Sequence, residues 1–192
     1  FSIGEPWQAV VANLGDGVVK GMDIDLKALV GDIQFGFNMT KVFDAYVNPM
    51  QSYPDARFEG GVADLGLDAK STLPLFGDMS YSLYTEYSGP INLFGDDTQG
   101  FARVQHSYNG ESLNQLSDGG NAPRFTQGDY RVTDLIMGFD VGDWKAQLSL
   151  NNITDERGIS YRDSSDFDPY YGRYSDSVIR PKNYSLSLRR YF

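Results

Sequence analysis

Apolar and polar residues alternate along most of this chain, and this two-residue period limits its fold more than any other feature. A period of two places all the apolar side chains on one face of a β-strand. Seven stretches show it clearly: 22–30, 33–39, 65–69, 79–87, 135–141, 144–150 and 184–188. The sequence therefore predicts an all-β protein with seven full strands, and W-Q-A-V-V-A at 7–12 predicts a partial strand before them.

Three similar tetrapeptides with Gly and Asp at their centre separate pairs of predicted strands. They are V-G-D-I at 30–33, F-G-D-M at 76–79 and V-G-D-W at 141–144. Gly adopts the positive φ that a two-residue hairpin turn needs. Three other connections are long and polar: 47–61, 89–129 and 155–179. Because each hairpin reverses the chain, we expect the Gly-Asp turns and the C-terminus at one end of an up-and-down antiparallel sheet, with the long loops at the other.

Short turns at one end of the sheet and long loops at the other are typical of outer-membrane β-barrels. The predicted strands also exceed the length of about five or six residues that is common in soluble proteins. Trp144 and Phe192 lie at the short-turn end, where barrels place aromatic residues. We therefore predict an antiparallel up-and-down transmembrane β-barrel segment of about seven to eight strands. A soluble β-protein with its apolar face packed inward alternates in the same way and is the alternative.

The composition excludes several classes of protein. A net charge of −10 argues against a general binder of nucleic acid or of anionic membranes. The absence of cysteine excludes disulfides and thiolate metal sites. No apolar run approaches the roughly 18 residues of a membrane-spanning helix. The chain begins at Phe1 without an initiator Met or a signal peptide, so we interpret it as a fragment or a processed piece.

Three segments of the chain carry a resemblance to a known family. They are V-V-A-N-L-G-D-G-V-V-K-G-M-D-I-D-L at 10–26, W-K-A-Q-L-S-L-N-N-I-T-D-E at 144–156 and R-P-K-N-Y-S-L-S-L-R-R-Y-F at 180–192. In this order they resemble the barrel of TonB-dependent receptors, the outer-membrane active transporters of Gram-negative bacteria. The second segment is similar to the family's penultimate strand, which ends in N-N-L-T-D, and the third to its closing strand. Arg190 stands where that closing strand usually has an aromatic residue.

The resemblance implies a location and a role. Residues 1–192 would be the C-terminal portion of a receptor β-barrel, with the plug domain and the TonB box outside this chain. The expected location is the outer membrane, with the long loops extracellular and the C-terminus periplasmic. The expected activity is energised uptake of a scarce small molecule such as an iron–siderophore or an oligosaccharide, without enzymatic chemistry or a cofactor. The expected partners are that ligand, the TonB complex through the missing N-terminal part, and outer-membrane lipid, but no nucleic acid.

Two groups of residues are assigned roles on this interpretation. The closing strand is expected to act as the assembly signal through Tyr184, Leu186, Leu188 and Phe192. The candidate ligand contacts are aromatic residues of the last long loop: Phe167, Tyr170, Tyr171 and Tyr174. A loop folded over its own aromatic side chains has the same composition and is the alternative. Asp163, Asp166 and Asp168 lack the spacing of an EF-hand calcium loop, so we interpret them as a solvated acidic segment.

Charged residues occupy the polar positions of the predicted strands. They are Asp23, Asp25, Asp64, Asp68, Glu86, Asp134 and Asp140, with Lys27, Lys70, Arg131 and Lys145 among them. We predict a salt-bridge lattice that faces the barrel lumen. Two other functions stay open, namely a small passive pore of eight strands and a barrel hydrolase that uses loop carboxylates with His106. The hydrolase would pair His106 with Ser107 or Ser112, although the sequence has no nucleophile-elbow motif. No residue is assigned as catalytic, cofactor-binding or metal-binding.

Overall fold

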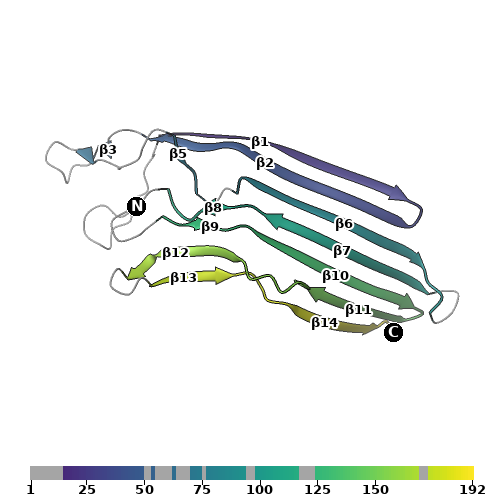
Figure 1. Ribbon diagram of the computed structural model, residues 1–192. Coiled ribbons are helices and arrows are strands. Elements are labelled where there is room, and N and C mark those ends of the chain that lie inside the picture. The colour runs from purple at the N-terminus through teal and green to yellow at the C-terminus, as the bar shows by residue number, and fades with distance from the viewer. Residues whose placement is uncertain are drawn as a thin grey trace.

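The chain folds into a curved antiparallel sheet that carries small hairpins at one end (Figure 1). The computed structural model describes residues 15–49, 53–54, 62–63, 70–74, 77–93, 98–116, 124–168 and 173–192. Seven long strands follow one another in the order of the chain: β1 (Gly15–Val30), β2 (Ile33–Pro49), β6 (Met79–Pro90), β7 (Gln99–Asn109), β10 (Tyr130–Val141), β11 (Trp144–Asn151) and β14 (Asn183–Arg190). The short strand β5 (Ser71–Thr72) pairs with the end of β2. This arrangement confirms the prediction of an all-β, up-and-down antiparallel fold.

The two ends of the sheet differ, as predicted. The Gly31–Asp32 and Gly142–Asp143 turns, the end of β6 and the start of β7 lie at the same end as the C-terminus (Figure 1). The opposite end carries three small hairpins: β3 (Tyr53–Pro54) with β4 (Val62–Ala63), β8 (Ser112–Leu113) with β9 (Thr126–Gln127), and β12 (Ile159–Asp168) with β13 (Arg173–Val178). Within the described ranges, no helix is long and apolar enough to cross a membrane.

Two of the three predicted Gly-Asp turns are tight hairpins. Val30 pairs with Ile33 and Val141 pairs with Trp144, so two residues make each turn. Gly31 has a φ of 59° and Gly142 a φ of 52°, whereas the aspartates that follow them have negative φ. A positive φ at the first turn position alone is the type II′ pattern, whose twist matches that of the flanking strands.

The third predicted turn, Gly77–Asp78, was wrong. β6 pairs directly with β2, and Met79 lies opposite Lys41 near the hairpin-bearing end of the sheet. Gly77 and Asp78 therefore lead into β6 from that end and do not connect two long strands at the short-turn end. The predicted strand at 65–69 and the partial strand at 7–12 fall outside the described residues.

The prediction of one long loop over residues 89–129 was also wrong, because the segment contains β7. Every residue of β7 pairs with both β6 and β10. Its positions on the apolar side of the sheet include Gly100, Ala102 and His106. Because these residues are small or polar, the sequence of β7 does not show the alternation of apolar and polar residues. The segment 155–179, predicted as a loop, likewise contains the hairpin β12–β13.

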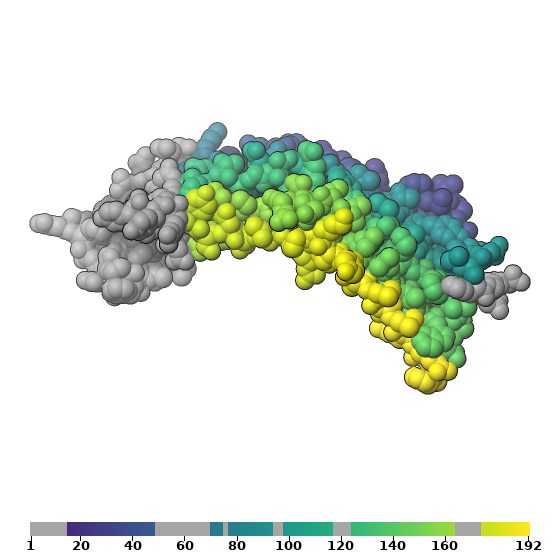
Figure 2. All heavy atoms as spheres, turned by 60° about the horizontal axis from the view of Figure 1, so that its bottom comes forward, coloured from purple at the N-terminus to yellow at the C-terminus, as the bar shows by residue number. Residues whose placement is uncertain are grey.

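The paired residues of neighbouring strands place the apolar side chains on one side of the sheet, here called the apolar face. One row of this face crosses all seven long strands: Val30, Ile33, Tyr87, Ala102, Met137, Leu148 and Leu186. These side chains do not form an internal core, since Val47 is the single buried hydrophobic residue among those described. Leu26 at one edge is 60% exposed and Leu186 at the other is 76% exposed. The sheet is one layer, bent along its length (Figure 2).

Candidate functional site

The opposite side of the sheet, here called the polar face, holds an ordered network centred on Tyr84. The Tyr84 ring lies directly over Gly36, where a Cβ would collide with it, so glycine is required at that position. The amide Nε2 of Gln34 donates a hydrogen bond of 2.8 Å to the Tyr84 hydroxyl. The Arg103 guanidinium lies 3.9 Å from the centre of the Tyr84 ring and 3.6 Å from a carboxylate oxygen of Glu86. The network joins β2, β6 and β7 and fixes a charged pair on the polar face.

Other charges along the strands make local pairs. Lys145 Nζ lies 3.2 Å from Asp140 across β10 and β11, and the Thr40 hydroxyl donates to Asp23 across β1 and β2 at 2.6 Å. Asp25 pairs with Lys27 on its own strand at 3.7 Å. These contacts agree with a lattice of charges on the polar face, although the pairs are local and exposed. Arg131 was wrongly predicted on that face, since it pairs with Tyr108 on the apolar side. Asp64 and Asp68 lie outside the described residues.

At the opposite end from the short turns, the hairpin β12–β13 holds a compact aromatic and charged cluster. Arg162 makes a two-pronged contact with Asp176, with Nε 2.6 Å from Oδ1 and a terminal nitrogen 2.8 Å from Oδ2. The same guanidinium lies 3.9 Å from the Tyr174 ring centre and 5.2 Å from that of Phe125. The Phe125 and Tyr174 rings are 5.1 Å apart. The hydrogen bonds from Arg162 lower the pKa of Asp176 below its usual range, so this pair is charged at neutral pH.

Among the four predicted ligand contacts, the structure describes the side chain of Tyr174 alone. Tyr174 lies on β13, is 42% exposed and is stacked on Arg162. The Phe167 side chain and all of Tyr170 and Tyr171 lie outside the described residues, so ligand contact stays a prediction. Sequence reasoning missed Arg162 and Asp176, because only the pairing of Arg162 with Asp176 across the hairpin brings the two together.

The other residues considered for chemistry are not brought together. His106 lies on the apolar face, where its Nδ1 is 2.9 Å from the Thr133 hydroxyl. Ser107 is the next residue of the same strand and points to the opposite face. No cluster of three His, Asp or Glu side chains suited to a metal occurs within the described part of the chain. The side chains of Asp166 and Asp168 are outside that part.

The N-N-I-T-D-E segment ends β11 and anchors the chain around Asn152. This residue is 2% exposed and has a φ of 50°, a conformation that Asn adopts more readily than most residues. Its Nδ2 donates to the carbonyls of Glu156 and Arg180 at 3.0 Å each, and its Oδ1 accepts from the Glu156 N–H at 2.9 Å. The Asp134 carboxylate accepts from the Asn152 N–H at 2.8 Å. One side chain thus ties the end of β11 to the segment that leads into β14.

The predicted assembly residues lie on the exposed edge strand β14. Tyr184, Leu186 and Leu188 pair with Leu150, Leu148 and Ala146, so all three lie on the apolar face. Arg190 pairs with Trp144 one row further toward the short-turn end, and Phe192 follows the strand. A role of these residues in assembly stays a prediction.

Comparisons with known proteins support the fold. No protein-family model matches the chain, and no curated protein matches it. Among solved structures, it is similar to the closed form of the ferric-catecholate import receptor Fiu from K12 E. coli, with a TM-score of 0.55. The two chains are 18% identical over 88% of this chain and 20% of Fiu, so this chain spans about a fifth of the receptor's length. At this identity the likeness concerns the fold: a stretch of antiparallel β-barrel wall.

Proposed function

We propose that this chain is the C-terminal portion of a TonB-dependent receptor barrel, which takes up a scarce small molecule across the outer membrane. One observation carries the proposal: the sheet has a continuous apolar face with no second layer over it within the described residues. A soluble sheet must bury such a face in a core, whereas a barrel wall exposes it to lipid. The likeness to part of Fiu supports the same conclusion.

In this proposal the barrel wall performs no bond chemistry. The apolar face contacts lipid, the polar face lines the lumen, and the hairpins at the end opposite the short turns receive the ligand outside the cell. Phe167, Tyr170, Tyr171 and Tyr174 would offer aromatic surface to an iron–siderophore or an oligosaccharide. The TonB complex would act through a plug and a TonB box beyond this chain, and the C-terminus would lie in the periplasm.

No observation specifically favours either alternative function, the passive pore or the barrel hydrolase. The eight-stranded pore would be closed by the partial strand predicted at 7–12, which lies outside the described residues. β1 and β14 are the two edges of the described sheet. A hydrolase centred on His106 would have its catalytic base on the apolar face, whereas the candidate nucleophile Ser107 points to the polar face.

Uptake by cells tests the proposal. We expect deletion of the gene to abolish accumulation of ferric catecholates or of an oligosaccharide, and an uncoupler to stop that accumulation in the wild type. Recovery of the complete gene product from the soluble fraction without detergent would overturn the membrane assignment. Uptake that continues unchanged with the uncoupler would favour a passive pore.

A further inference from the structure

Arg190 places a positive charge on the apolar face at its short-turn boundary. Its partner in β11 is Trp144, and the neighbouring row holds Ala146 and Leu188. The Arg190 guanidinium lies 5.4 Å from the Trp144 ring centre and 5.0 Å from that of Phe192. No acid in the described part of the chain lies within ion-pair distance of Arg190. A guanidinium at the edge of hydrocarbon that lacks an acidic partner favours an anion from the membrane itself.

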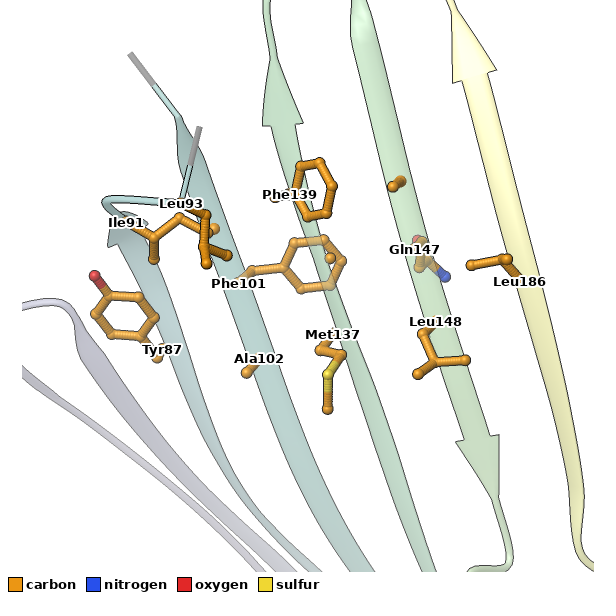
Figure 3. Close-up of a pocket in the computed structure, with 13 residues that line it drawn as sticks. Tyr87, Ile91, Leu93, Phe101, Ala102, Met137, Phe139, Gln147, Leu148 and Leu186 are labelled. Atoms are coloured by element: carbon orange, nitrogen blue, oxygen red, sulfur yellow. The ribbon is translucent and has the colours of Figure 1, made fainter. Parts of the chain in front are cut away.

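An apolar groove of about 400 Å³ lies on the same face (Figure 3). It begins at Ala146, one row away from Arg190. Its floor is low at Ala102 and Ala146, which have small side chains, whereas the Ile91 side chain lies over Gly100. Larger side chains form its walls: Tyr87, Ile91, Met137, Phe139, Leu148 and Leu186. Its lining is almost entirely hydrocarbon, which suits an alkyl chain and not a polar ligand.

We propose that these two features together bind one phospholipid. The phosphate lies against Arg190 between Trp144 and Phe192, and an acyl chain lies in the groove over Ala146 and Ala102. A guanidinium binds phosphate through paired hydrogen bonds, and Trp favours the boundary between hydrocarbon and headgroups. The head and tail sites are adjacent rows of the same strands, so one lipid spans both. Lys145, on the opposite face, is paired with Asp140.

This inference rests on the proposed membrane location, so membrane residence is measured first for every variant. The complete gene product is then purified in detergent, delipidated and titrated with phosphatidylglycerol, with native mass spectrometry counting the lipids bound. We expect Arg190→Leu to weaken binding of one lipid about tenfold, as expected for the loss of one charge-assisted hydrogen-bonding group. Ala146→Phe, which fills the groove and keeps the charge, should weaken it as well.

Arg189→Leu is the matched control, since Arg189 is the preceding residue of β14 and points to the polar face. We expect its lipid binding to equal that of the wild type. The inference is overturned if Arg190→Leu binds the lipid normally, or if Arg189→Leu loses as much affinity. It is also overturned if inorganic phosphate or the free glycerophosphoglycerol headgroup binds as tightly as the complete lipid, because the groove would then contribute nothing. A failure of membrane residence in the wild type would instead contradict the proposed function.

Discussion

The side chain of Asn152 shows how much a single buried polar residue contributes to this sheet. It satisfies two carbonyls and one N–H from segments on both sides of the hairpin β12–β13. A single-layer sheet has little internal core, so such polar anchors hold its connections in place. Asp155 is an exposed anchor of the same connection, since its carboxylate accepts from the Lys182 N–H at 3.1 Å and from Arg157 at 3.0 Å.

We expect Asn152→Ala to destabilise the folded protein by roughly 4 kcal/mol. Three hydrogen bonds are lost at about 1 kcal/mol each, and Ala is strained at a positive φ. The measurement is the urea midpoint of the refolded complete protein. Asn38→Ala is the control, because Asn38 is exposed on β2, and its change should stay within about 0.5 kcal/mol. Equal effects of the two substitutions would contradict the anchoring role.

The stability contributed by Asp155 should depend on pH. Its pKa is lowered, first by the hydrogen bond from the Lys182 N–H and then by Arg157. A lowered carboxyl pKa contributes stability above the unfolded value of about 3.9, and that stability is lost as the pH falls through the folded value. Asp155→Asn should therefore flatten the dependence of the urea midpoint on pH in the acid range. If the urea midpoint of Asp155→Asn depends on pH as it does in the wild type, Asp155 does not contribute to the acid loss of stability.

At the scale of elements, the two-residue period predicts the strands whose apolar positions hold large side chains. It fails for β7, where Gly100 and Ala102 occupy such positions, and where Phe101 lies on the polar side and covers Gly138. It fails again at Gly77–Asp78, because local sequence does not say which strand β6 pairs with. The Arg162–Asp176 cluster could not be predicted either, since it depends on the register of a hairpin inside a presumed loop.

The hairpin β12–β13 and the end of β14 should have separable roles. Deleting residues 163–174 removes the hairpin tip, while the base keeps its hydrogen bond from the Ile179 N–H to the Gly158 carbonyl. We expect weaker ligand binding at a normal surface level. Removing Tyr191 and Phe192 deletes the hydrogen bond from the Tyr191 N–H to the Asp143 carbonyl and the aromatic end of the chain. Surface level, measured by antibody on the same cells as binding, should fall in this truncation. A lower surface level in the hairpin deletion, with a normal level and normal binding in the truncation, would contradict these separate roles.

At the scale of the whole molecule, the proposed barrel requires lipid to cover the apolar face. Phe37 lies on that face in the middle of β2, opposite Leu26 and Leu83. Replacing it with Arg should cost ~2–4 kcal/mol if the position contacts the bilayer midplane. Asn38→Arg, on the polar face of the same strand, should cost much less. The comparison is made by urea titration of the complete protein folded into vesicles, and equal costs would contradict a lipid-facing surface.

The most direct test labels single cysteines on paired positions of β2 and β6, since the chain has no cysteine of its own. Phe37 and Leu83 form a pair on the apolar face, and Asn38 and Ser82 form the adjacent pair on the polar face. In the complete protein folded into vesicles, a water-soluble maleimide should label Cys substitutions at Asn38 and Ser82. Cysteines at Phe37 and Leu83 should resist it and should be quenched by a spin label carried in the lipid tails. Labelling of all four positions by the aqueous reagent at similar rates, without lipid quenching, would contradict the membrane-barrel account.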